Sequence, residues 1–255
     1  MTTPPSSIES GAPQPARMGD FARLTGVLFS PKATFQDIAA RPSWVAPMII
    51  MILISLALSI VLGTRLDWMA VARRNIERSS FASAQMEKAP PDQREKAYER
   101  QATIQKITRY VRGVIGTPLL TLFLAAIYLV VFNLIAGARA KFEMAFTLVT
   151  FSLIPIALRE ILAIPIVFLR DPTSIDPENI VASNFGAFLS GDAPLWLVAL
   201  GRSVDLFGLW AAVLTAIGFA ATYPKKVRLG TALSIVFGVY VVFTLLGVGI
   251  AGAFS

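Results

Sequence analysis

The sequence predicts an all-α, polytopic membrane protein with five transmembrane helices. Only 15% of its 255 residues are charged, whereas a soluble domain carries about 25%, and its mean hydropathy is +0.64. The apolar residues gather in runs, and a helix of roughly 20 such residues crosses a hydrocarbon core about 30 Å thick. The charged segment between the first two runs predicts a helical hairpin outside the membrane.

Four of the apolar runs are long and uncharged, and a fifth, residues 144–169, is interrupted by Arg159 and Glu160. Residues 144–158, the uncharged first part of this run, are about 22 Å long as a helix, which is too short to cross the hydrocarbon core alone. We therefore expect one kinked helix with breaks at Pro155 and Pro165. Five crossings place the two chain ends on opposite sides. The predicted spans, within a membrane domain over 44–255, are 44–63, 115–138, 144–169, 205–223 and 229–254.

The first 43 residues precede the membrane domain. Residues 1–19 are rich in Pro, Ser and Thr and predict a disordered tail. Residues 20–43 predict two short amphipathic helices, with Ser30 as the N-cap and Pro31 as the first residue of the second helix. Two placements stay open, namely at the lipid interface or against the bundle. No cleavable signal peptide is expected, so the first span is retained.

The segment over 64–114 predicts the helical hairpin. Residues 64–115 contain 11 Lys/Arg and 6 Asp/Glu. Two arms of about 25 residues would extend roughly 35–40 Å from the membrane, with the turn near Pro90. Apolar residues of the second arm recur at helical spacing and predict the seam of an antiparallel pair. These residues are Ala97, Ile104, Ile107, Val111 and Val114.

The basic residues of the hairpin have two interpretations. They form a docking surface for a protein partner or for anionic lipid headgroups, or they only solvate two helices. Interleaved acidic residues argue against nucleic-acid binding. The six candidates are Arg73, Arg74, Arg78, Lys106, Arg109 and Arg112.

Charged residues at membrane depth are the usual place to look for function. Arg159 and Glu160 are adjacent, so on a helix they point about 100° apart and each needs another partner. We expect a pair between Arg159 and Asp205 or between Glu160 and Arg202. Whether this cluster of four is functional or only structural stays open.

Small residues recur at helix-packing spacing in the last two spans. They predict close helix contacts, either within the bundle or across a dimer. These residues are Gly208, Ala212, Gly230, Ser234 and Gly238.

The chain has no cysteine and no histidine. Disulfides, thiolate nucleophiles, Cys/His zinc sites and Ser-His-Asp triads are thereby excluded. We expect no enzyme, no catalytic residue, no cofactor and no metal. The expected partners are the lipid bilayer and an unidentified membrane or soluble protein, with a homo-oligomer as a further option. The working hypothesis is a scaffold or assembly factor. The alternative is a small-solute transporter or channel subunit, which a hydrated cavity touching Arg159 and Glu160 would favour.

Three stretches carry a family resemblance. GVLFSPKATFQDIAARPSWVAP, before the first span, resembles the corresponding segment of the bacterial branch of the Yip family (Ypt-interacting proteins). VTFSLIPIAL is similar to that family's proline-bearing third span, and LFGLWAAVLTAIGFAATYPKKVRLGTALSIV to its last two spans. The resemblance covers about 20–255, with the hairpin as an insertion.

The resemblance implies a five-span protein of the cell (inner) membrane with a cytoplasmic N-terminus. Eukaryotic members act in vesicle trafficking and bind Rab-type GTPases, but a shared fold does not transfer this function. Positive charge gives a mixed signal on orientation, since nine bases lie on the amino-terminal side and 11 in the hairpin. We follow the family orientation and leave open which side the hairpin faces.

Overall fold

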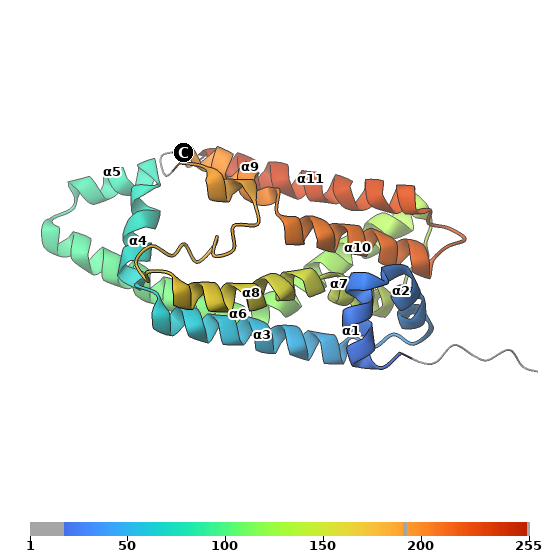
Figure 1. Ribbon diagram of the computed structural model, residues 1–255. Coiled ribbons are helices and arrows are strands. Elements are labelled where there is room, and N and C mark those ends of the chain that lie inside the picture. The colour runs from blue at the N-terminus through green and yellow to red at the C-terminus, as the bar shows by residue number, and fades with distance from the viewer. Residues whose placement is uncertain (1–17, 191–192, 254–255) are drawn as a thin grey trace, which may run out of the picture.

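The computed structural model describes residues 18–190 and 193–253, and the regular elements of these residues are all helices (Figure 1). The elements are α1 (Asp20–Phe29), α2 (Pro31–Ala40), α3 (Val45–Arg65), α4 (Trp68–Glu77), α5 (Ser80–Lys88), α6 (Pro91–Ala136), α7 (Phe142–Ser152), α8 (Ile154–Leu169), a 3₁₀ turn η1 (Phe185–Phe188), α9 (Leu195–Ser203), α10 (Leu206–Thr222) and α11 (Leu229–Ala253).

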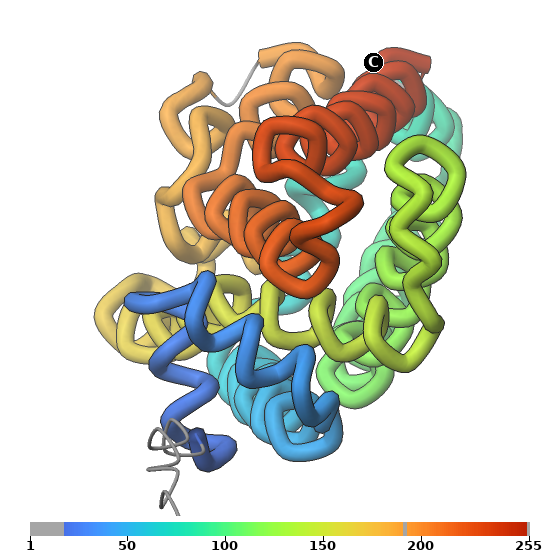
Figure 2. Tube along the Cα trace, turned by 90° about the vertical axis from the view of Figure 1, so that its right-hand side faces the viewer, coloured from blue at the N-terminus to red at the C-terminus, as the bar shows by residue number. Residues whose placement is uncertain are grey.

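The long helices lie side by side in one bundle (Figures 1 and 2). Four are long and apolar enough to cross a membrane, namely α3, α6, α7 with α8, and α11, and α10 is a shorter apolar helix of 17 residues. The all-α polytopic class is therefore confirmed. We call the end with α1 and α2 the amino-terminal end. The opposite end, with α4, α5 and the start of α6, is the hairpin end.

The third predicted span is divided where a proline was expected to divide it. The break falls at Leu153, and Pro155 lies in the first turn of α8, where its missing N–H costs no hydrogen bond. The expected break at Pro165 is wrong, because α8 continues through it to Leu169. Neighbouring helices allow a proline inside a membrane helix.

The predicted hairpin forms with one continuous arm and one broken arm. The 46 residues of α6 extend about 69 Å, more than twice the hydrocarbon thickness. The first arm is not an extension of α3, as Figure 1 shows. Asp67 caps a new helix by accepting from the Ala70 amide at 3.0 Å, and Ser79 caps the next by accepting from the Ala82 amide at 3.3 Å. These two N-caps turn the first arm into α4 and α5.

The predicted seam on α6 forms only in part. Its first two residues, Ala97 and Ile104, line a hollow with Ile76 and Met86 of the first arm, but Ile107, Val111 and Val114 face outward. Ile104, Ile107, Val111 and Val114 are between 45% and 57% exposed, whereas Ala102, on the other side of α6, is buried with residues of α4. The side of α6 that faces the bundle carries small and polar residues, which a search for an apolar stripe passes over. An apolar stripe is thus left open on this helix.

Both amino-terminal helices pack on the bundle, and α1 also exposes apolar side chains. Phe35 and Ile38 of α2 are fully buried in the main core, so α2 packs on the bundle. On α1, Val27 is fully buried in the same core, whereas Phe21 and Phe29 are 78% and 82% exposed, as suits a helix that also borders the lipid interface. The expected disordered tail at 1–19 falls almost wholly outside the described residues.

Arg23 of α1 is an unexpected buried charge in this region. It is 3% exposed and pairs with Asp37 at 2.7 Å. Burial raises the pKa of Asp37, but hydrogen bonds and charges from Arg23 and Arg41 outweigh this and leave that pKa below its usual value.

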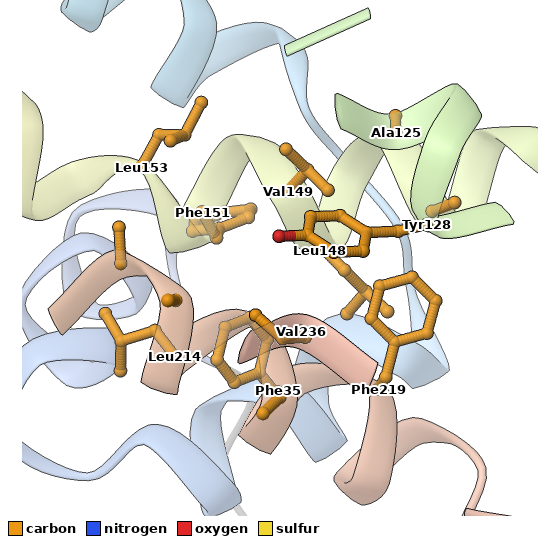
Figure 3. Close-up of a cluster of buried hydrophobic side chains, with 14 of the residues drawn as sticks. Phe35, Ala125, Tyr128, Leu148, Val149, Phe151, Leu153, Leu214, Phe219 and Val236 are labelled. Carbon is orange, nitrogen blue, oxygen red and sulfur yellow. The ribbon is translucent and has the colours of Figure 1, made fainter. Parts of the chain in front are cut away.

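Aromatic and aliphatic side chains pack together near the amino-terminal end of the bundle (Figure 3). The rings of Phe132 and Phe219 stack at 3.9 Å, and Tyr128 packs against both. Phe35 and Phe151 are fully buried in the same cluster. Large apolar side chains therefore form the core of this half of the bundle.

Glycines set the close approach of α3 and α6. A Cβ atom added at Gly113 would overlap the Ser59 hydroxyl and lie 3.2 Å from the Ser55 backbone oxygen, and one added at Gly63 would overlap Tyr110. The two helices consequently touch almost backbone to backbone at this crossing.

We expect Gly113→Val to destabilise the protein, because an overpacked contact costs about 1–3 kcal/mol. The matched control is Gly238→Val on α11, since a Cβ atom there meets open space. Thermal unfolding of both purified variants in the same detergent measures the difference. Equal midpoints for the two variants would contradict the close crossing.

Candidate functional site: an arginine-lined cavity

The helical path is interrupted between α9 and α10, in the hairpin half of the bundle. Both helices pack along α11, and their lengths of about 14 and 26 Å together match the 38 Å or so of α11. At the break, the Tyr240 hydroxyl of α11 donates to the carbonyl of Ser203. Within a membrane, backbone N–H and C=O groups outside a helix need hydrogen-bond partners from the protein or from a polar cavity. The break between α9 and α10 has partners in the protein and lies beside a polar cavity.

The loop that connects α8 to α9 folds back and is held by bases of the hairpin. Arg74 donates to the carbonyls of Thr173 and, at 2.6 Å, of Ile175. Arg78 pairs with Asp176 at 3.5 Å. At the start of the loop, hydrogen bonds from the Thr173 hydroxyl and amide lower the pKa of Asp171. The loop is therefore anchored to α4, with Ile175 fully buried.

Asp205 is the polar centre of the break. Its carboxylate pairs with Arg159 at 3.2 Å, accepts from the Gly208 amide at 2.8 Å and accepts from the Ser183 hydroxyl. It is 6% exposed. One buried carboxylate thus caps α10, fixes the returning loop and neutralises an arginine of α8. The expected Arg159–Asp205 pair forms.

Arg202 and Glu160 do not pair with each other. Arg202 binds Asp176 at 2.8 Å and Glu178 at 2.5 Å. Glu160 accepts a hydrogen bond from the Ser55 hydroxyl at 3.3 Å. The acidic partners of Arg202 lie in a loop outside every predicted span, so a search for charges at membrane depth missed them.

These groups surround a cavity of about 350 Å³ between α3, α6, α8 and the returning loop. A neighbouring cavity of about 250 Å³ shares Arg109, Arg112 and Glu178 with it. We call the first the arginine cavity. Its charged lining residues are Arg109, Arg112, Arg159, Glu160, Glu178 and Arg202.

The six bases expected to form one docking surface are divided among different roles. Arg74 and Arg78 hold the loop, and Arg73 pairs with Glu95 at 3.4 Å. Arg109 and Arg112 line the arginine cavity, and Lys106 is exposed. The structure therefore brings Arg109 and Arg112 together with the predicted membrane-depth cluster. Arg78 reaches this cluster through Asp176, whose carboxylate it shares with Arg202, and the other three bases lie apart from it.

The five small residues predicted to mediate helix packing lie in different surroundings on α10 and on α11. Ala212 is 6% exposed, and a Cβ atom at Gly208 would lie 3.3 Å from the Tyr240 hydroxyl, so α10 uses its small residues within the bundle. On α11, Gly230, Ser234 and Gly238 are exposed, and the two glycines face open space. The expected contact within the bundle is wrong for α11 because its Ala232 and Val236 face the core instead. Their use in a dimer stays a prediction.

The chemistry of the site is that of charge and hydrogen bonding. Within residues 18–190 and 193–253, no group of three or more acidic side chains is placed to hold a metal ion. The cavity offers guanidinium donors and carboxylates, which are suited to binding a polar or anionic group.

The bundle, the broken fourth span and the amino-terminal helices define a polytopic helical membrane protein. A family model, the Yip1 domain, matches residues 25–251. The chain therefore belongs to the Yip1 domain family. No curated protein and no solved structure matches the chain.

We expect Asp205→Ala to destabilise the protein by about 3 kcal/mol, because the cap and the neutralising charge are both lost. Asp205→Asn keeps an N-cap and is expected to lose about 1 kcal/mol. Thermal unfolding of the purified variants gives the comparison. A wild-type midpoint for Asp205→Ala would contradict the central role of this carboxylate.

Proposed function

We propose that this protein is a non-enzymatic membrane scaffold or assembly factor that binds a partner membrane protein. The observation that supports this most strongly is the open stripe on α6. Ile107 and Val111 are 57% and 48% exposed on a helix that continues well beyond the end of α3. Exposed apolar residues at helical spacing are typical of a helix-binding surface.

The chemistry of this surface indicates the kind of partner. Arg100 lies about two helical turns before Ile107, on the same face and exposed. A complementary partner is an amphipathic helix whose apolar stripe ends in an acidic residue. Such a helix would complete the antiparallel pair that the α6 pattern predicts.

To test this, a photo-crosslinking amino acid is placed at Ile107 or Val111 in cells, with Glu99 as the matched exposed control on α6. We expect one adduct of defined mass from the two stripe positions and none from Glu99. Asp substitution of the crosslinked protein's apolar stripe should then abolish the adduct. Adducts with lipid alone, or with a second copy of this chain, would contradict a partner protein.

A small-solute transporter is the second candidate. The arginine cavity contacts both Arg159 and Glu160, and this observation favours it. The aromatic core around Phe132 and Phe219 fills the other half of the bundle, so a transport path would require that core to open. The scaffold is therefore the function that the geometry supports best.

We further propose that the amino-terminal end faces the cytoplasm of the cell (inner) membrane. The short basic turn over 225–228 supports this orientation. The native chain lacks cysteine, so Gln85→Cys on α5 and Lys226→Cys in that turn, both exposed, serve as reporters.

In intact cells, a membrane-impermeant maleimide is expected to label only Gln85→Cys. Permeabilised cells, in which both variants should react, provide the control. Labelling of Lys226→Cys alone in intact cells would reverse the orientation.

A further inference from the structure

We propose that the arginine cavity binds a phosphate group. The first argument is the balance of charge, since four arginines and two glutamates line the cavity. Arg159 and Arg202 have carboxylate partners. Arg109 and Arg112 make no hydrogen bond or ion pair with any described residue. The cavity thus holds two guanidinium groups that lack a counter-charge in direct contact.

The second argument is the presence of buried donors without acceptors. The Nε and Nη2 atoms of Arg109 and the Nε atom of Arg202 are buried and have no hydrogen-bond partner in the described part of the chain. An unsatisfied buried donor costs about 1–3 kcal/mol, and a charged one costs more. A ligand that brings several acceptor oxygens into this cavity would remove that cost.

Phosphate matches this arrangement better than a single small acceptor does. Arginine presents its donors as a planar fork that binds phosphate oxygens in pairs. Arg109 and Arg112 come from α6, while Arg159 and Arg202 come from α8 and α9. Donors from three helices can surround a tetrahedral group.

The depth and size of the cavity fit a headgroup. Tyr110, next to Arg109, covers Gly63 near the end of α3, so these arginines lie where α3 leaves the hydrocarbon core. A volume of about 350 Å³ is at the small end of ligand pockets, which measure about 300–1,000 Å³. Anionic lipid headgroups and free phosphate share this chemistry. The proposal does not depend on the scaffold function, since Arg109 and Arg112 are not among the exposed apolar residues that would contact a partner.

The test uses the full-length protein purified in a non-ionic detergent. Inorganic phosphate is titrated against chloride of equal ionic strength, and thermal unfolding measures binding. In parallel, native mass spectrometry measures retention of phosphatidylglycerol in competition with phosphatidylcholine. We expect at least one probe to bind, and Arg109→Gln and Arg112→Gln to weaken that binding about tenfold or more.

Lys106→Gln is the matched control, because it removes an exposed charge from the same end of α6 and should bind like the wild type. Glu160→Gln keeps an acceptor for Ser55 and removes a competing negative charge from the cavity, so it should bind several-fold more tightly. This gain cannot result from misfolding.

Binding of phosphatidylglycerol alone would identify a lipid headgroup as the source, and binding of inorganic phosphate alone would identify a soluble one. Either result supports the proposal. It is overturned if neither probe binds, if Lys106→Gln weakens binding as much as Arg109→Gln, or if Glu160→Gln binds no more tightly than the wild type.

Discussion

The hairpin half of this bundle depends on satisfying the backbone where the fourth span breaks. α10 has 17 residues, too few to cross about 30 Å of hydrocarbon, so its first amides and the preceding loop lie at membrane depth. An unpaired amide there costs several kcal/mol. Asp205 meets this requirement together with Ser183 and Tyr240. A buried carboxylate in turn requires a nearby cation, which Arg159 supplies.

This requirement divides the molecule into two physically different halves. Near the amino-terminal end, buried aromatic and aliphatic side chains pack α2, α6, α7 and α10 together, and the rings of Phe132 and Phe219 stack between α6 and α10. At the hairpin end, ion pairs and hydrogen bonds hold the returning loop against α4, α8 and α9. The half near the amino-terminal end supplies the stability that comes from packing. The polar half can retain a cavity because its walls are held by directed bonds.

The parts of the fold that could be predicted from the sequence are those that depend on the type of a single residue or a short run of residues. Long uncharged runs located the spans, Pro155 marked the break before α8, and the need of Arg159 for a partner led to Asp205. The face of α6 that packs inward was not predictable in the same way. It carries Ala102 and Gly113, and only the geometry of α3 and α4 makes these small residues the contact face. The role of Asp176 likewise depends on a loop folding back, which no periodicity encodes.

The position of Arg109 is the feature that packing leaves unexplained. Removing a guanidinium from water costs several kcal/mol unless a counter-charge and hydrogen bonds replace the water. Arg23, which is 3% exposed, has such a replacement in Asp37, and Arg159 has one in Asp205. Arg109 has buried donors and no bonded acceptor, although nearby Glu160 offers a carboxylate on the same cavity. The protein therefore maintains charge around this space at a cost to its own stability, as preorganised anion sites do.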